Sequence, residues 1–198
     1  PMLDISAIIR ELPSVKEIAI VALNNECKEI LTYLEYGYQG EVIICADNII
    51  TKREERVSSF SSTIDKESAA VVKFADKIEG YLHIPNRAIL KAGFFKTVSE
   101  YFSLLKIAKS SHIYTSDIIP ENFPGRTLKV IEVIDFNKKG IKEVSQKYPK
   151  ANIATYNFPI PAQELSKRLK IEDGGNIFII ASTLNDHSKV LILSQENN

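Results

Sequence analysis

The sequence predicts a mixed α/β fold, of the α+β kind in its last third, and two patterns predict it. Helix-like and strand-like segments alternate over residues 3–46, and residues 128–194 follow the order strand, helix, strand, helix, strand, strand. The chain has 198 residues with 44% apolar content. It is therefore long enough to bury one good core or two small ones.

The first third is predicted to begin with a short amphipathic helix, Leu3–Leu12, which Asp4 can cap and Pro13 stops. A buried strand follows at Val15–Leu23. Four apolar residues at helical spacing, Cys27, Ile30, Leu31 and Leu34, predict a second helix that Asn24-Asn25 opens and Gly37 ends. Glu41–Ala46 is predicted as a second buried strand and Val57–Ile64 as an edge strand.

The middle of the chain is marked by aromatic residues. The pattern weakens over Asp65–Pro85, which favours a boundary there. Beyond it, Ala88–Leu90 and a set of apolar side chains at helical spacing predict the buried face of a helix that Gly93 interrupts: Phe94, Phe95, Val98, Tyr101, Phe102 and Leu105. Ser110–Arg126 is predicted to be a loop, because Pro120 and Pro124-Gly125 are turn signals.

The last third has the clearest pattern. Strands are predicted at Leu128–Phe136, Asn152–Asn157, Asn176–Ser182 and Lys189–Ser194, and helices at Lys138–Lys147 and from Pro161 to near Lys170. The run Ile177–Ile180 is continuously apolar, which predicts a strand covered on both faces.

Charge is unevenly distributed although the net charge is zero. Residues 84–170 hold 15 Lys and Arg against 7 Asp and Glu, whereas residues 1–83 hold 9 against 14 and residues 171–198 hold 1 against 4. A basic block of this kind can attract phosphate, which indicates a nucleic-acid surface. The alternative is a solvated surface whose lysines are scattered over several faces. The candidate RNA-binding residues are Lys91, Lys96, Arg126, Lys138, Lys139, Lys142, Lys150, Lys167 and Arg168.

Helical periodicity favours one group within this block. At about 100° per residue, Lys138, Lys142 and Lys139 point away from the apolar Ile141 and Val144. Lysines at the C-terminal end of a helix are also common because they suit the helix dipole, which is the alternative for Lys167 and Arg168. The aromatic residues that could stack on bases here are Tyr148, Tyr156 and Phe158.

The sequence holds no recognisable catalytic, cofactor or metal motif. No glycine-rich loop follows a predicted strand, and His83, His112 and His187 stand far apart. The two cysteines, Cys27 and Cys45, are expected to be small core residues. The hydroxyl cluster Tyr114, Thr115 and Ser116 with Asp117 lacks a nearby base, so local capping and turn bonds are its expected role.

No signal peptide and no apolar stretch of the length needed to span a bilayer is present. We therefore expect a cytoplasmic protein with no membrane partner. A predicted helix begins almost at Pro1, as after a cut inside a longer protein. Strand edges exposed by such a cut could pair between chains and give a homodimer.

Three ordered stretches resemble a known family: PMLDISAIIRELPSVKEIAIVALNNECKEIL at the start, YLHIPNRAILKAGFFK with HIYTSDIIPENFPGR in the middle, and NIATYNFPIPAQELSKRLKIEDGG near the end. They resemble the C-terminal half of bacterial class I SAM-dependent methyltransferases that end in a ferredoxin-like segment and a THUMP-like domain. The resemblance implies that residues 1–80 are the end of a Rossmann-like methyltransferase fold, that residues 81–126 are ferredoxin-like and that residues 127–198 are THUMP-like.

The resemblance also implies a function. THUMP domains are RNA-binding modules, so the chain would be the part of an RNA methyltransferase that recognises its substrate, with tRNA or rRNA as the partner. The SAM-binding motifs would lie upstream, so SAM is expected for the full-length protein and no cofactor or catalytic activity for this chain alone. The upstream catalytic domain is then a further partner. The alternative is a structural region, or one for protein interaction or dimerisation, that binds no nucleic acid, for which an exposed apolar patch is expected.

Overall fold

The computed structural model describes residues 4–51 and 56–196. The chain divides into two compact units that interleave in sequence. The first unit comprises Pro1–Val72, Pro85–Phe102 and Glu121–Arg126, and the second comprises Lys73–Ile84, Ser103–Pro120 and Thr127–Asn198.

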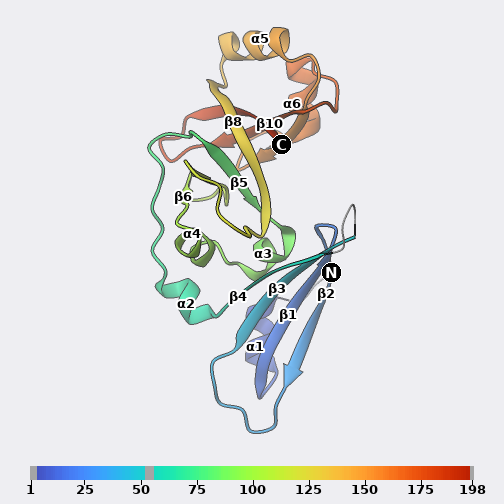
Figure 1. The fold of residues 1–198 in the computed structure, drawn as a ribbon, viewed down its shortest axis with the longest axis vertical. Helices are drawn as coiled ribbons and strands as arrows, with labels where there is room; N and C mark the ends of the chain where they lie inside the picture. Colours follow the sequence, from blue (N-terminus) through green and yellow to red (C-terminus); the bar gives the residue numbers. More distant parts are fainter. Residues whose placement is uncertain (1–3, 52–55, 197–198) are drawn as a thin grey trace. The chain divides into compact units, whose positions relative to one another are not determined.

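The first unit contains a four-stranded sheet of order β2-β1-β3-β4 (Figure 1). Its strands are β1 (Val15–Leu23), β2 (Glu26–Leu34), β3 (Ile43–Ile50) and β4 (Arg56–Ser62), and its helices are α1 (Ile5–Glu11), α2 (Ile64–Ala69), α3 (Arg87–Ala92) and α4 (Thr97–Tyr101). β1 and β3 are parallel, and the other two pairs are antiparallel. This mixed sheet does not show a Rossmann-like arrangement.

Several elements of this unit confirm the sequence prediction. Asp4 caps α1, since its Oδ1 accepts a 2.7 Å hydrogen bond from the backbone N–H of Ser6. The apolar Ile5 and Ile8 of that helix are buried. β1 has the predicted bounds, and β4 lies at a sheet edge.

The predicted helix after Asn24 is wrong, because these residues form the β1–β2 hairpin. β2 pairs antiparallel with β1, from Val15 opposite Leu34 to Leu23 opposite Glu26. Asn24 and Asn25 have φ of 49° and 67°. Positive φ at both central residues is what a two-residue type I′ turn requires, and asparagine adopts it readily. The alternation of helix and strand predicted for residues 3–46 therefore does not hold.

The aromatic segment after Pro85 is two short helices rather than one. Gly93, with φ of 77°, ends α3 in the left-handed conformation. Phe94 and Val98 are buried as predicted, but Tyr101 is 74% exposed. Leu105 is also misplaced, since it lies in a strand of the second unit.

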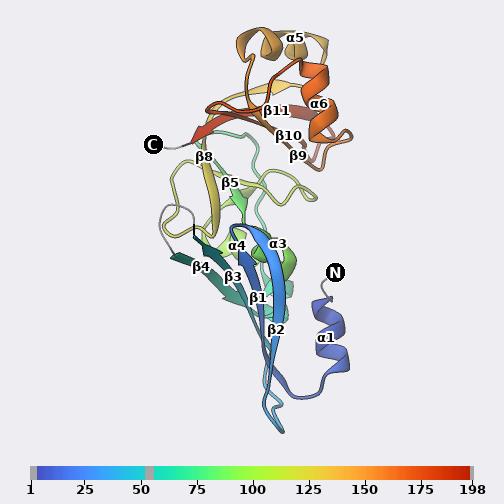
Figure 2. The ribbon, with the colours of Figure 1, turned by 90° about the vertical axis from the view of Figure 1, so that its right-hand side faces the viewer.

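The second unit contains a seven-stranded sheet of order β6-β7-β5-β8-β11-β10-β9. Its strands are β5 (Tyr81–Pro85), β6 (Leu105–Lys106), β7 (Tyr114–Ser116), β8 (Gly125–Asp135), β9 (Asn152–Tyr156), β10 (Ile177–Thr183) and β11 (Lys189–Glu196). The predicted loop Ser110–Arg126 thus includes β7 and the start of β8. Two helices, α5 (Lys138–Lys147) and α6 (Ala162–Leu169), lie on one face of β9, β10 and β11 (Figure 2).

The strands and helices of the last third confirm the predicted βαβαββ order, with α5 at the predicted bounds. β10 is covered on both faces, also as predicted. Ile179 belongs to the core beneath the helices, with Leu165 and Leu169, whereas Ile180 belongs to the opposite core, with Leu82 and Ile113. The sheet thus packs against the apolar side of a helical layer.

Candidate nucleic-acid interface

Only Phe136 and Asn137 separate the end of β8 from the start of α5. The side-chain Oδ1 of Asn137 caps the helix by accepting a 2.9 Å hydrogen bond from the N–H of Gly140. A Cβ at Gly140 would lie 2.1 Å from the carbonyl oxygen of Asp135, so only glycine allows this close approach. Gly140 and Val144 are buried against the sheet. This packing fixes the opposite side of α5 toward solvent.

Lys138, Lys139 and Lys142 are exposed on that side, as helical periodicity predicted. Among the described residues, none of the three lies within 4.0 Å of a carboxylate oxygen. Lys138 and Lys139 occupy the first turn, which holds no acidic residue. A cation there opposes the helix dipole and costs on the order of 0.3–1 kcal/mol. The stability of α5 therefore does not account for these two lysines.

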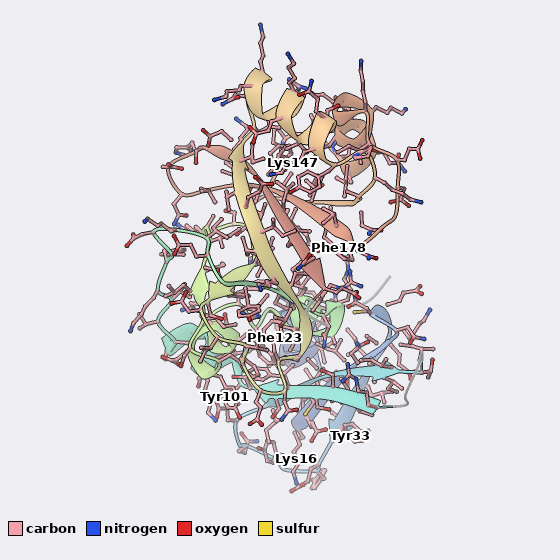
Figure 3. All side chains as sticks on the ribbon, turned by 45° about the horizontal axis from the view of Figure 1, so that its top comes forward. Lys16, Tyr33, Tyr101, Phe123, Lys147 and Phe178 are labelled. Atoms are coloured by element: carbon pink, nitrogen blue, oxygen red, sulfur yellow. The ribbon has the colours of Figure 1, made fainter. Side chains whose placement is uncertain are left out.

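Lys147, in the last turn of α5, has a different role. Figure 3 shows where Lys147 lies on the ribbon. Its Nζ lies 2.6 Å from Oε1 of Glu132 on β8, and the hydroxyl of Tyr148 donates to the same oxygen. The hydrogen bond with Glu132 raises the pKa of Lys147. Lys147 therefore holds α5 to the sheet and is less available to a ligand than the lysines of the first turns.

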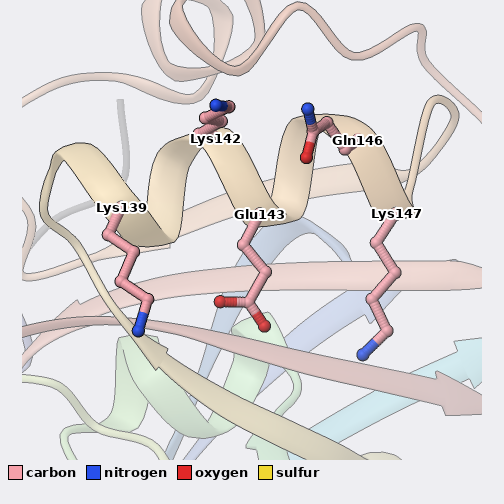
Figure 4. Close-up of a pocket in the computed structure, with 5 residues that line it drawn as sticks. All are labelled: Lys139, Lys142, Glu143, Gln146 and Lys147. Atoms are coloured by element: carbon pink, nitrogen blue, oxygen red, sulfur yellow. The ribbon is translucent and has the colours of Figure 1, made fainter.

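The outer side of α5 carries a shallow, open hollow of about 380 Å³, lined by Lys139, Lys142, Glu143, Gln146 and Lys147. Figure 4 shows Lys139, Glu143 and Lys147 reaching to one side of the helix and Lys142 and Gln146 projecting to the other. Because these side chains diverge, the hollow is a surface for contact with a large ligand rather than a reaction chamber.

The basic residues of the second unit are concentrated in this helical layer. Residues 137–170, which span α5, β9 and α6, hold 8 Lys and Arg against 2 Asp and Glu. Residues 171–196 hold 1 against 4. Lys167 and Arg168 are exposed in the last turn of α6, which lies beside α5 (Figure 2). The layer as a whole therefore presents a positive surface.

Two protein-family models match the chain from residue 81 onward. Residues 81–124 match the family model of a ferredoxin-like domain, and residues 125–196 match the family model described as THUMP domain-like. The chain contains a ferredoxin-like domain followed by a THUMP-like domain. The helical layer with α5 and α6 belongs to the THUMP-like domain.

A solved structure is similar over nearly the whole chain. It is the crystal structure of a "putative methyltransferase" from Porphyromonas gingivalis W83, with 34% sequence identity and a TM-score of 0.92. The match covers 98% of this chain and 49% of that protein, so this chain spans about half its length. No curated protein matches the chain.

The structure brings together only part of the predicted set. Lys138, Lys139 and Lys142 on α5 and Lys167 and Arg168 on α6 share the helical layer of the THUMP-like domain. The side chain of Lys150 lies against the turn at Gly174. A Cβ built on Gly174 would lie 3.0 Å from Cε of Lys150.

The other three candidates, Lys91, Lys96 and Arg126, belong to the first unit. Lys96 supports local structure there, since its Nζ donates a 2.6 Å hydrogen bond to the carbonyl oxygen of Ser68. Lys91 is half-buried on α3, and Arg126 is exposed at the start of β8. Their predicted role in RNA binding stays a prediction.

The sequence did not reveal the partner of the hydroxyl cluster. The fully buried His83 places Nε2 2.7 Å from Oγ of Ser116 and Nδ1 3.0 Å from Oγ1 of Thr127. The Ser116 hydroxyl donates to the carbonyl oxygen of Ile118, so its one hydrogen is used and Nε2 of His83 must donate to it. Nε2 of His83 thus donates a hydrogen bond to the serine hydroxyl, whereas a general base must accept the proton of that hydroxyl. Only the Ser116–Ile118 bond is local as expected, since the Thr115 hydroxyl lies 2.8 and 2.9 Å from the carbonyl oxygens of the distant Glu79 and Tyr81.

Burial strongly shifts the pKa values of two side chains, His83 and Cys45. Desolvation lowers the pKa of His83 to about 4. Desolvation, followed by the nearby carboxylates of Glu17 and Asp47, raises the pKa of the Cys45 thiol to about 11. Cys27 and Cys45 are both free and half-buried rather than core residues.

Within the described ranges, no three His, Cys, Asp or Glu side chains gather as a metal site would require. Each helix there is too short or too polar to cross a membrane.

Proposed function

We propose that the THUMP-like domain binds RNA through its helical layer, and that the chain is the substrate-recognition part of a SAM-dependent RNA methyltransferase. Two findings support this: the THUMP domain-like match over residues 125–196, and the similarity to half of a protein named as a methyltransferase. SAM binding and methyl transfer would then belong to the half of the longer protein that this chain does not span.

One observation carries the proposal. Lys138, Lys139 and Lys142 are exposed on α5 and no described carboxylate pairs with them, although the helix dipole disfavours positive charge at Lys138 and Lys139 in the first turn. An unpaired cluster with an energetic cost to the helix is explained when an anionic ligand neutralises it. The phosphates of RNA are such a ligand, and lysines suit them as compact point charges.

The test is fluorescence anisotropy with tRNA and with a matched double-stranded DNA at about 50 mM and about 200 mM salt. If the three lysines each neutralise one phosphate, the affinity that they contribute falls about 40-fold over this interval. The variant Lys138→Glu/Lys139→Glu/Lys142→Glu should lose most of the binding and most of the salt dependence.

The matched control reverses three exposed lysines outside the helical layer, Lys66, Lys73 and Lys77, and changes the net charge equally. It should bind tRNA nearly as well as the parent chain. Equal loss in both triple variants would show that net charge alone drives binding. The absence of tRNA binding at low salt would refute RNA recognition by this domain.

A second candidate function, protein interaction, is favoured by the open face of the four-stranded sheet. One face is buried by Ile18, Ile20, Ile44 and Ala46, and Phe60 of β4 packs on Phe94 there. The strand register places exposed apolar side chains on the opposite face: Leu23, Leu31, Tyr33, Ile43 and Val57. This face is the exposed apolar patch that an interaction region requires.

The same face carries the carboxylates of Glu17, Glu29 and Asp47, none of which forms an ion pair with a described residue. Stacking two copies of the face would bring like charges together, so a basic, apolar partner fits better than a homodimer. Analytical ultracentrifugation tests this point. A dimer of the parent chain that Leu31→Lys dissociates would show that the face binds its own copy.

A further inference from the structure

The aromatic residues of the THUMP-like domain are engaged inside it. Among residues 125–196 none of the five is exposed: Phe136, Tyr148, Tyr156, Phe158 and Phe178. The rings of Phe136 and Phe158 meet edge to face with centroids 5.0 Å apart. The Tyr148 hydroxyl is bound to Glu132, and Tyr156 and Phe178 pack on the core of the sheet face opposite the helices. Tyr148, Tyr156 and Phe158 are therefore not free stacking platforms.

The arginine of the layer is engaged as well. The guanidinium carbon of Arg168 lies 4.9 Å from the ring centroid of Phe136, so this ring already occupies one face of the cation. Unpaired RNA bases are recognised mainly by stacking on aromatic rings and on arginine planes, together with hydrogen bonds to their edges. The surface formed by α5 and α6 therefore offers few free aromatic rings or arginine planes on which a base could stack.

What the surface does offer is lysine ammonium groups on rigid helices. Lys138, Lys139 and Lys142 act as point charges and contact phosphates without regard to the base. Double-stranded DNA carries about one charge per 1.7 Å of axis, against about one per 3.4 Å for each strand, and an RNA duplex likewise carries the phosphates of two strands. A surface that relies on phosphates gains most from the denser array.

We propose that the helical layer of the THUMP-like domain recognises double-stranded RNA through its phosphate backbone rather than unpaired bases. The inference rests on the proposed RNA binding and specifies its substrate class. The duplex is the ligand of Lys138, Lys139, Lys142 and Lys167, whereas Lys147 and Arg168 mainly hold the layer together.

The first experiment compares a fluorescent RNA duplex of about 16 base pairs with one of its own strands, chosen to be unstructured, by anisotropy. We expect the duplex to bind at least about tenfold more tightly. With four phosphate contacts, the affinity for the duplex should fall about 150-fold between about 50 mM and about 200 mM salt, and that for the single strand about 50-fold.

The second experiment introduces an exposed aromatic ring, on which a base could stack. Gln146 is exposed beside Lys142 on α5 (Figure 4), so Gln146→Tyr places a ring on the basic surface. One stacked base should raise the affinity for the single strand about tenfold and leave the affinity for the duplex unchanged. Gln39→Tyr, at an exposed position of the first unit, is the matched control and should change neither affinity.

The outcomes separate this inference from the function on which it rests. If neither RNA form binds at low salt, RNA recognition itself fails. If the single strand binds as tightly as the duplex, or Gln146→Tyr leaves its affinity unchanged, RNA binding stands and the duplex preference is overturned. Preference for the duplex together with a gain for the single strand in Gln146→Tyr alone would support the inference.

Discussion

His83 should make the stability of the second unit depend on pH. The side chain is 0% exposed and bonded through both ring nitrogens, to Ser116 and to Thr127. Desolvation lowers its pKa from 6.5 to about 4, so the folded protein keeps the ring neutral over an interval in which the unfolded chain takes up a proton.

The sign and the size of the effect follow from this difference. The stability that the neutral ring contributes is fully present above pH 6.5 and is lost progressively as the pH falls toward the folded pKa of about 4. At about 1.4 kcal/mol per pK unit, the loss in the free energy of unfolding is on the order of 3 kcal/mol. Such a loss is a large share of the stability of a small domain.

The assay is guanidinium unfolding followed by circular dichroism at about pH 7 and at about pH 4.5, on the parent chain and on His83→Gln. Carboxylates titrate in both proteins, so the difference between the two pH dependences isolates His83. Because the glutamine side chain does not titrate, the variant should be less stable at neutral pH but lose about 2–3 kcal/mol less on acidification. His83→Phe serves as a second, non-titrating variant.

An NMR titration of the His83 ring gives an independent check, with His83→Gln assigning the signal. A ring that titrates near its ordinary pKa of 6.5 would refute the reasoning. So would parallel loss of stability in the parent chain and in both variants.

Two further predictions concern stability. Gly140→Ala should lower the free energy of unfolding by about 2 kcal/mol, because the new Cβ would lie 2.1 Å from the Asp135 carbonyl oxygen. Thermal melts of this variant and of the control Gln146→Ala would check it. An unchanged melting temperature in Gly140→Ala would contradict the close approach. Glu67→Ala should also cost about 2 kcal/mol, because its carboxylate accepts hydrogen bonds of 3.1, 2.8 and 2.9 Å from the N–H groups of Phe95, Lys96 and Thr97. Urea unfolding against the neighbouring Asp65→Asn, expected to be nearly neutral, measures it, and equal values for the two variants would contradict the stabilising role of these three hydrogen bonds.

The last third was predictable because its signals are local and agree with one another. Ile141 and Val144 recur at helical spacing in α5, and the run Ile177–Ile180 has no polar interruption. The direction of Lys138 and Lys142 followed from the same periodicity, so the lysine cluster of the candidate site was predictable as well.

The β2 strand was not predictable by the same rule. The apolar residues Cys27, Ile30, Leu31 and Leu34 fit the period of a helix, but the Asn24-Asn25 turn returns the chain along β1. The cross-strand hydrogen bonds with β1 then outweigh the spacing of the apolar side chains. Asparagine at two consecutive positions was a turn signal that the helical spacing concealed.

By itself, the sequence determined the helices and strands of the last third, the basic excess of residues 84–170 and the outward direction of the α5 lysines. Only the tertiary structure decided which charges stay free. Glu132 neutralises Lys147 from 15 positions away, Phe136 holds Arg168, and His83 meets Thr127 across 44 positions. Local patterns report the face that a residue occupies, whereas its partner is set by the way distant segments are brought together in the sheet.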